Sequence, residues 1–330
     1  MGPDPALVER FRADLDALSA PGERIGIAVS GGPDSLALLL LAAAARPGEL
    51  EAATVDHGLR AESRAEAEMV ERICAELRVP HQILVAEWSE PPSTAIQERA
   101  REARYRLLGG WLAERKLKAL ATAHHADDQA ETILMRLNRG SGLRGLAGMR
   151  PKSVIPGSRL PLLRPLLGWQ RAELVQICDA AGIEPADDAS NADEQFERVR
   201  IRKALAGAAW LSPEALARSA AHLASADDAL GWVAEGLALA RVTDDADGLQ
   251  VDAAGLPAEL QRRLLLIAFA RFHAAEPRGA DLMRAIETLS QGNTATLSGL
   301  RLDGGHPWRV SKAPPRRDAA ARSEADSTFG

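Results

Sequence analysis

One stretch decides the fold: Ile25-Gly26-Ile27-Ala28-Val29-Ser30-Gly31-Gly32-Pro33-Asp34-Ser35-Leu36-Ala37-Leu38-Leu39-Leu40-Leu41. Its first apolar run predicts a buried parallel strand, a turn of small residues follows, and the run rich in Leu and Ala predicts a helix. Glycines in such a turn let the backbone approach a ligand closely, and the first amides of the helix lack partners within it. The hydroxyl groups of Ser30 and Ser35 add donors. The turn is therefore predicted to hold an anion, and a phosphate group is the expected one.

The turn contains a carboxylate, Asp34, and no lysine. A Walker-type loop is longer and ends in Gly-Lys-Ser/Thr, whose lysine reaches the β- and γ-phosphates. A carboxylate beside a bound phosphate needs a cation, and Mg²⁺ is the simplest one. The alternative is a tight Gly-Gly-Pro turn in which Asp34 only caps the helix. The strand, turn and helix context favours the phosphate site.

The composition indicates an ordinary globular protein. The chain has 330 residues, of which 46% are hydrophobic and 26% charged, enough for a large domain and a smaller one. Aromatic residues make up only 4%, so a base-stacking surface of the single-strand-binding kind is not expected. Cys74 and Cys178 form neither a disulfide framework nor a Cys-x-x-Cys motif, which suits a reducing compartment. Without a signal-peptide core or a membrane-length apolar run, we expect a cytoplasmic protein with no membrane partner.

Three further apolar runs alternate with helical patterns and predict strands at Leu50–Val55, His81–Ala86 and Ala119–Ala123. Such alternation predicts an α/β fold, a parallel sheet with helices on both faces. Ligands bind these sheets beyond the carboxyl ends of the strands. That rule gathers three polar segments at one edge: Ser30–Ser35, Asp56–Arg60 and His124–Thr132.

The rest of the chain predicts a connector and a second, smaller domain. Asn138–Pro165 is rich in Gly, Pro and Arg, and we expect it to be a functional or mobile loop. Ser212–Ala240 predicts a long helical connector. Two helices and a hairpin then indicate a small α+β domain, at Pro257–His273, Ala280–Ser290, Thr294–Leu302 and Trp308–Lys312. The expected domains are 1–210 and 211–312, with a disordered tail at 313–330.

The densest polar cluster runs from His124 to Thr132, after a strand and at the start of a helix. Asp128 and Glu131 are three residues apart and share one helix face. Acidic residues in a first helical turn also favour the helix dipole, which is the simpler interpretation. The adjacent pair His124 and His125 does not predict zinc, since sequence neighbours face different ways and no third ligand has the right spacing. Mg²⁺ held by Asp34 and Asp128 is the preferred hypothesis, with either histidine as a proton donor or phosphate contact.

Two basic groups are candidates for phosphate contacts. Arg101 and Arg104 share one face of a predicted helix, where a guanidinium suits a phosphate. The cluster Arg198–Lys203 either stabilises a helix C-terminus or, together with the basic segment Arg136–Arg150, contacts a nucleic-acid backbone. The net charge of −6 does not exclude such a partner, because binding follows local patches.

These residues resemble a known family. The turn Ser30–Ser35 is similar to the pyrophosphate loop of the N-type ATP pyrophosphatases. Within that superfamily, four further stretches resemble the bacterial tRNA(Ile)-lysidine synthetases: Val55–Arg60, His124–Thr132, Arg139–Leu146, and Asp188–Asn191 with Phe196–Arg202. The order and spacing of all five blocks fit, and the resemblance runs over roughly residues 20–205. Beyond about residue 210 only the layout is similar.

The resemblance implies an adenine nucleotide alpha hydrolase-like fold and a two-step ligation. The carbonyl oxygen at position 2 of the wobble cytidine in a CAU-anticodon tRNA(Ile) attacks the α-phosphate of ATP, and free L-lysine then displaces AMP. The implied ligands of ATP are Ser30, Gly31, Gly32, Pro33, Asp34, Ser35, His57 and His124. Asp34 and Asp128 are the implied Mg²⁺ ligands. The implied catalytic residues are Asp34 and Asp128, Arg104 at phosphate, Glu131 at an ammonium of lysine, and Arg202 at the nucleotide or the lysine carboxylate. A homodimer is compatible with this resemblance.

The chain departs from the family pattern at two positions. Asp56 stands where a histidine is frequent, and Val199 where an asparagine is frequent. The first affects expected adenosine contacts, and the second removes a polar group near the expected tRNA or lysine site.

The alternative functions are a tRNA thiolase of the same superfamily, which needs catalytic cysteines, and a non-catalytic nucleotide- or tRNA-binding module. A glutamine-dependent amidotransferase needs a glutaminase domain, for which the chain has no room.

Overall fold

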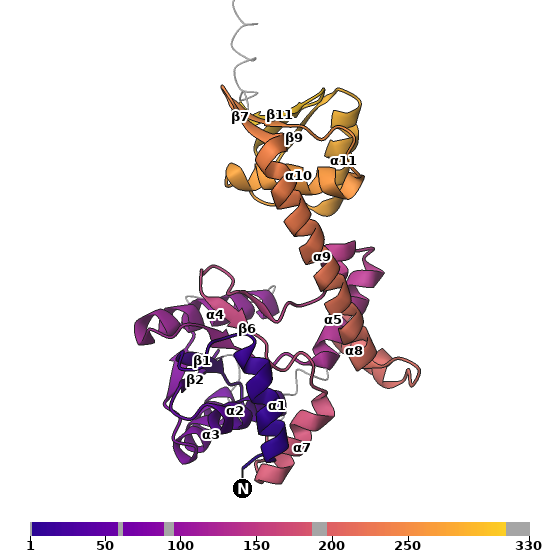
Figure 1. Cartoon of the computed structure of the whole chain (residues 1–330). Coiled ribbons are helices and arrows are strands. Elements are labelled where there is room, and N and C mark those ends of the chain that lie inside the picture. The colour runs from indigo at the N-terminus through magenta and orange to yellow at the C-terminus, as the bar shows by residue number, and fades with distance from the viewer. Residues whose placement is uncertain (1, 59–61, 89–95, 187–196, 315–330) are drawn as a thin grey trace, which may run out of the picture. The chain divides into compact units, whose positions relative to one another are not determined.

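The computed structural model describes residues 2–58, 62–88, 96–186 and 197–314 (Figure 1). The chain forms two compact units, Met1–Ala224 and Ser225–Gly330, which divide within helix α9 (Pro213–Arg241). The expected domain boundary at residue 210 stays a prediction, and the expected tail lies almost wholly outside the described residues. Within the described ranges, no helix has the length and apolar character needed to cross a membrane.

A six-stranded sheet lies at the centre of the first unit. Its order is β3 (His81–Val85), β2 (Leu50–Asp56), β1 (Ile25–Ala28), β4 (Leu120–Ala121), β6 (Pro161–Leu163) and β5 (Lys152–Val154). The first five strands are parallel and only β5 pairs antiparallel. The predicted α/β fold is thus confirmed. Strands β5 and β6 lie in the segment for which the sequence predicts only a loop, because three-residue strands are too short to show a periodic pattern.

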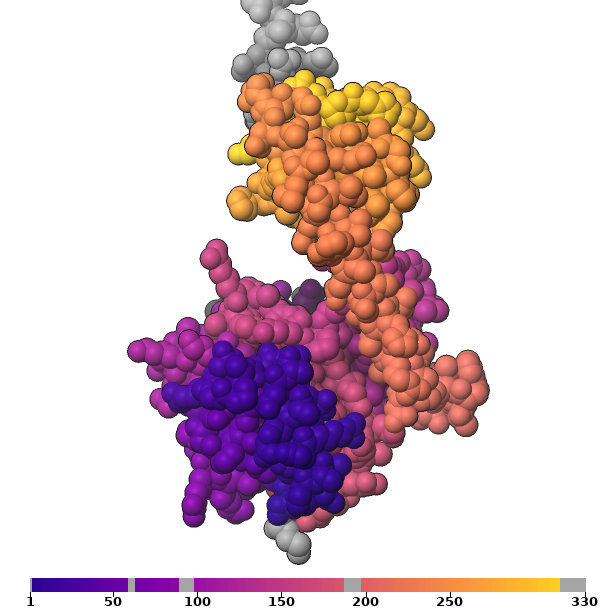
Figure 2. Space-filling view, viewed as in Figure 1, coloured from indigo at the N-terminus to yellow at the C-terminus, as the bar shows by residue number. Residues whose placement is uncertain are grey.

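Helices cover both faces of this sheet. Helices α1 (Pro5–Asp16), α2 (Pro33–Ala45), α3 (Glu62–Glu76) and α7 (Arg171–Ala181) contribute to the hydrophobic core on one face, which contains Ile25 and Ile27. Helix α4 (Ile96–Arg115) packs on the other face (Figure 1). A Cβ atom on Gly26 would lie 2.5 Å from the Trp111 ring, so glycine lets α4 approach β1 closely. The residues of α1 form part of the surface of this unit (Figure 2).

The glycine-rich segment after α5 (Ala126–Asn138) is more ordered than the sequence predicts. It contains the short helix α6 (Leu143–Leu146) and the strands β5 and β6. Arg136 on α5 donates to the carbonyl groups of Gly145 (2.6 Å) and Gly148 (3.0 Å). Helix α8 (Glu197–Ala206) then packs against α5.

The second unit is a small α+β domain, as expected. Its antiparallel sheet has the order β7 (Val242–Asp245), β8 (Gly248–Val251), β11 (Trp308–Lys312), β10 (Leu300–Asp303) and β9 (Thr294–Leu297). Helices α10 (Ala258–Arg271) and α11 (Gly279–Ser290) bury apolar residues with it. The single strand predicted at Thr294–Leu302 is wrong, because positive φ angles at Ser298 and Gly299 form a two-residue turn between β9 and β10.

Candidate active site

The turn after β1 presents backbone amide groups rather than a side-chain cap. Gly31 has a φ of +89°, which glycine adopts without strain. Ser35 Oγ accepts from the amide of Ser30 (3.1 Å) and donates to the carbonyl of Gly32 (2.9 Å). Gly32 is the N-cap of α2 and makes no side-chain cap hydrogen bond. Asp34 therefore does not cap the helix, and the first amides of α2 are available to an anion.

His125 connects this turn to the acidic start of α5. Its Nε2 atom lies 3.5 Å from Oδ2 of Asp34 and 3.5 Å from Oδ2 of Asp128, and its Nδ1 lies 3.4 Å from Oδ2 of Asp127. Burial alone would lower the pKa of His125. The close carboxylates of Asp127 and Asp34, together with the charge of Asp128, outweigh burial and raise that pKa to about 10. The side chain is 3% exposed, so a buried imidazolium neutralises part of the acidic cluster.

The carboxylates of Asp34 and Asp128 fit a magnesium ion held together with phosphate. Oδ1 of Asp34 is buried and has no hydrogen-bond partner in the structure. Oδ2 of Asp128 accepts from the His125 amide (3.1 Å), so this residue also caps α5. In the described ranges no group of three or more His, Cys, Asp or Glu residues is arranged to hold a metal by itself. Mg²⁺ is commonly held by one or two carboxylates with phosphate oxygens and water, which this pair can provide.

Glu131 is nearly inaccessible and is paired with two arginines of α8. Its Oε2 lies 2.5 Å from Nε of Arg198, and its Oε1 lies 2.7 Å from Nε of Arg202. Arg198 also contacts Oδ1 of Asp128 at 2.5 Å. The Glu131 side chain is 2% exposed, against 42% and 36% for the two arginines. The structure therefore brings Asp34, Asp128, Glu131 and Arg202 into one connected cluster. Arg198 also belongs to it, although the sequence analysis considered this residue only as part of the basic cluster Arg198–Lys203.

The two remaining predicted ATP ligands follow β4 and β2, the strands on either side of β1. His124 follows β4, and its Nδ1 lies 2.9 Å from Oγ1 of Thr122. Burial is the largest of the effects that lower the pKa of His124 to about 4, although the charge of Asp128 opposes them. The charges of Arg164, Arg198 and Arg101 contribute to the same lowering. The imidazole is therefore neutral near pH 7. His57 follows β2, and its carbonyl accepts from Trp88 Nε1 (2.8 Å).

Both departures from the family pattern have local structural roles. Asp56 is buried and accepts from the Gly58 amide (2.9 Å) and from Ser63 Oγ (2.7 Å). Burial would raise the pKa of Asp56, but these hydrogen bonds and the charge of Arg64 outweigh burial and lower it. Val199 is buried on α8, and an apolar side chain there leaves no buried polar group without a partner.

Arg104 is exposed on α4, with its guanidinium 5.9 Å from the centre of the Tyr105 ring. Arg101 lies closer to that ring, at 5.0 Å. Within the described part of the chain, no hydrogen bond or ion pair joins Arg104 to the cluster around His125. The predicted contact of Arg104 with phosphate stays a prediction.

Gln129 was not predicted as a functional residue, yet it holds the glycine-rich segment. Its Nε2 donates to the carbonyl of Met149 (2.8 Å), and its Oε1 accepts from the amide of Met149 (2.7 Å). Gly148 has a φ of +66°, and a Cβ atom there would lie 2.5 Å from Gln129 Oε1. The only sequence signal for this arrangement is the glycine itself.

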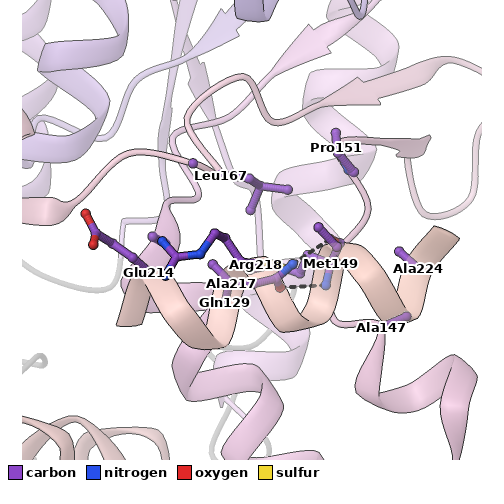
Figure 3. A pocket seen from close by; sticks show the side chains of 12 residues that line it. Gln129, Ala147, Met149, Pro151, Leu167, Glu214, Ala217, Arg218 and Ala224 are labelled. Atoms are coloured by element: carbon purple, nitrogen blue, oxygen red, sulfur yellow. Dashed lines mark hydrogen bonds between the residues drawn. The ribbon is translucent and has the colours of Figure 1, made fainter. Parts of the chain in front are cut away.

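A cavity of about 380 Å³ lies against α5 (Figure 3). Ala126 and Gln129 of α5 line it, and they project from the helix face opposite Asp128 and Glu131. The first turns of α9 form another wall, with Glu214 and Ala217 among the lining residues. The cavity is therefore separate from the acidic cluster.

Comparisons with known proteins agree with this architecture. The family described as "PP-loop domain" matches residues 7–209, so the chain is a PP-loop protein. A tRNA(Ile)-lysidine synthase of Novosphingobium aromaticivorans is 49% identical over 93% of the chain and 94% of that protein. One of Zymomonas mobilis is 43% identical over 92% of both. The chain belongs to the tRNA(Ile)-lysidine synthase family and is an ATP-dependent ligase of the PP-loop class.

A solved structure shows the same fold at low sequence identity. The U34-tRNA thiolase NcsA of Methanococcus maripaludis, with its [4Fe-4S] cluster, superimposes with a TM-score of 0.54 at 16% identity. The superposition covers 66% of this chain and 78% of that one. Its likeness concerns the fold alone.

Proposed function

We propose that this enzyme ligates L-lysine to position 2 of the wobble cytidine in a CAU-anticodon tRNA(Ile), using ATP and an adenylated tRNA intermediate. One observation carries the proposal. Asp34 of the pyrophosphate loop and Asp128 of the acidic helix lie at equal distance, 3.5 Å, from one imidazole nitrogen. The loop for a leaving pyrophosphate and the acidic cluster therefore form a single site at the carboxyl edge of the sheet.

In the first step the chain binds ATP and orients its α-phosphate. The backbone amides of Gly31, Gly32, Asp34 and Ser35 are the proposed hydrogen-bond donors to the departing pyrophosphate, since the Ser30 amide donates to Ser35 Oγ and Pro33 has no amide hydrogen. Asp34 and Asp128 would hold Mg²⁺, which offsets the charge that develops in an in-line displacement. The absence of a loop lysine agrees with reaction at the α-phosphate, where no clamp on the γ-phosphate is needed.

In the second step the ε-amine of lysine displaces AMP from the tRNA. Glu131 is the proposed contact of a lysine ammonium group, and Arg202 of the lysine carboxylate or the nucleotide. Both carboxylate oxygens of Glu131 are engaged by Arg198 and Arg202. An ammonium group at Glu131 must therefore share an oxygen with an arginine or replace one. In the second case the side chain of Arg198 or Arg202 must leave its carboxylate oxygen when lysine binds.

The two alternative functions have weaker support. A thiolase of this superfamily needs reactive cysteines, but Cys74 and Cys178 are both buried in the apolar core. Burial raises the pKa of each thiol to about 12, with a smaller contribution from nearby carboxylates, and this suppresses the reactive thiolate. A non-catalytic binding module has no need for a cluster that joins Asp34, Asp128 and Glu131.

Labelled lysine provides the direct test. The purified chain is incubated with ATP, Mg²⁺, labelled L-lysine and a tRNA(Ile) transcript with a CAU anticodon. We expect label in the tRNA that depends on ATP, and none in a transcript whose wobble cytidine is replaced by uridine. No incorporation, with an active synthetase alongside as a positive control, would refute the proposed function.

A further inference from the structure

The carboxyl edge of the sheet extends beyond the pyrophosphate loop to the neighbouring strands β4 and β6. These strands are parallel, with Ala121 opposite Leu163. The amide of Thr122 donates to the carbonyl of Leu163 (3.0 Å). Arg164 is the first residue beyond β6, and His124 follows β4. The two residues therefore lie at the same edge, where ligands of parallel sheets bind.

Arg164 is 8% exposed, and only one of its nitrogens has a hydrogen-bond partner in the structure. Nη1 donates to the carbonyl of Arg150 (2.8 Å) and to Ser153 Oγ (2.9 Å). Nε is buried without a partner, and no hydrogen bond is formed by Nη2 within the described ranges. The Nε and Nη2 edge of a guanidinium is the one that binds an oxyanion through two parallel hydrogen bonds. That edge of Arg164 is not used by the protein.

Arg164 also lacks a carboxylate counter-ion in the described part of the chain, although a buried charge is costly without one. Arg101 is exposed beside the Tyr105 ring and has no carboxylate partner within the same ranges. The contrast with α8 is clear, since Arg198 and Arg202 are neutralised by Asp128 and Glu131. The charges of Arg164, Arg101 and Arg198 all lower the pKa of His124, and the charge of Asp128 opposes them.

We propose that Arg164, together with Arg101 of α4, forms a phosphate-binding subsite at the β4–β6 edge, separate from the pyrophosphate loop. The inference rests on the proposed function only in that the phosphate belongs to one of its two substrates. The phosphate is either that of ATP or a backbone phosphate of the tRNA. Both sources present the same oxyanion, for which the unpaired Nε and Nη2 atoms of Arg164 are a suitable pair of donors.

Three variants of the full chain test this subsite. Arg164→Lys keeps the charge and removes the planar fork, while Arg101→Gln removes an exposed charge without disturbing the core. Arg106→Gln is the matched control, an exposed arginine further along the same helix α4. Equilibrium binding is measured separately for ATP and for the tRNA(Ile) transcript, and thermal unfolding is recorded for each variant.

We expect Arg164→Lys to weaken binding of one ligand by about 10-fold, and Arg101→Gln to weaken the same ligand by a smaller factor. Arg106→Gln should stay within about 2-fold of the wild type for both ligands. A loss confined to ATP assigns the nucleotide phosphate. If only the affinity for tRNA falls, the phosphate belongs to the RNA backbone. In that case the salt dependence of tRNA binding should also decrease, by the amount expected for about one lost phosphate contact.

The proposal is overturned if both variants, Arg164→Lys and Arg101→Gln, bind ATP and tRNA as tightly as the wild type does. This holds even if Arg164→Lys unfolds at a lower temperature. In that outcome Arg164 serves only to hold the segment Arg150–Ser153. If Arg164→Lys does not fold, Arg101→Gln decides. Binding does not require lysidine formation, so a chain that binds both ligands but incorporates no lysine refutes the proposed function and leaves the subsite intact.

Discussion

Nε2 of His125 lies 3.5 Å from Oδ2 of Asp34, which joins the start of the acidic helix to the pyrophosphate loop. The contact crosses from α5 to α2, two helices that begin at the carboxyl ends of the adjacent strands β4 and β1. Because His125 also contacts Asp128, neutralising any one of these side chains changes the electrostatics of the other two.

The first prediction concerns Asp34→Asn. This substitution keeps the size of the side chain and removes its charge, so pyrophosphate release in the presence of tRNA should fall by at least about 100-fold. The variant should still fold but unfold at a lower temperature, because the buried His125 loses the charge of one of its carboxylate neighbours. Asp179→Asn, an exposed carboxylate on α7, is the matched control and should release pyrophosphate normally. Normal release by Asp34→Asn would exclude its proposed role as a metal ligand.

A second prediction concerns the contact between β1 and α4. In Gly26→Ala the new methyl group would lie 2.5 Å from the Trp111 ring and 2.6 Å from Leu112. We expect a loss of about 1–3 kcal/mol in the free energy of unfolding from overpacking. In the control Gly110→Ala nothing lies within 4 Å of the added group, so the same change on α4 should stabilise by about 0.5–1 kcal/mol. Urea unfolding measures both, and equal stabilities of the two variants would contradict the packing.

The parts of the fold that the sequence predicts well are those with a long periodic pattern. The buried strand at Ile25 and the leucine-rich helix after it each extend over enough residues to show their period. Strands β5 and β6 have three residues each, which is too few to show a periodic pattern in the sequence. The turn at Ser298 and Gly299 was missed although the sequence signals it, because Ser-Gly favours a turn and Leu297 and Leu300 are three residues apart, which breaks the two-residue period of a strand.

In the candidate active site, too, only the features that follow from a sequence pattern were predicted. Asp34, Asp128 and Glu131 were predicted together because strand order places their segments at one edge. The ion pairs of Glu131 with Arg198 and Arg202 span 67 and 71 residues, and no local pattern specifies such a distance. Arg164 was missed for a related reason, since a single arginine in an irregular segment becomes notable only when its burial and its unpaired hydrogen-bond donors are seen.

A third prediction concerns acid stability. Nε2 of His81 lies 2.9 Å from Thr54 Oγ1, and its Nδ1 is buried without a hydrogen-bond partner in the structure. Burial lowers the pKa of His81, and the charge of Glu71 opposes this only in part. The unfolded chain therefore binds a proton below about pH 6.5 that the folded chain resists. Stability contributed by the neutral imidazole is complete above that pH and decreases as the pH falls.

His81→Gln tests this linkage, because glutamine retains a partner for Thr54 and does not titrate. The free energy of unfolding of the variant should fall less steeply than that of the wild type between pH 7 and 5, by at most about 1.4 kcal/mol per pH unit. His222→Gln, on an exposed part of α9, is the control for removal of a histidine. Parallel curves for His81→Gln and the wild type would show that His81 contributes nothing to the acid transition.

The last prediction separates the two arginines of α8. Arg198 contacts both Asp128 and Glu131, whereas Arg202 contacts only Glu131 within the described ranges. Asp128 belongs to the proposed ATP step and Glu131 to the proposed lysine step. Arg198→Gln should therefore reduce pyrophosphate release measured without lysine by about 10–100-fold, as expected for a residue that orients a metal ligand. Arg202→Gln should leave that release near the wild-type rate and reduce only lysine incorporation, because the loss of a charge-assisted hydrogen bond amounts to about 1.5–3 kcal/mol.

Arg72→Gln, an exposed arginine on α3, is the control for both assays. The stability of each variant is measured as well, since Glu131 is 2% exposed and loses one of its two partners in either case. If Arg202→Gln slowed pyrophosphate release as much as Arg198→Gln does, the two steps would not be divided between Asp128 and Glu131. The cluster would then act as one electrostatic unit, in which the second arginine matters because it keeps Glu131 from drawing Arg198 away from Asp128.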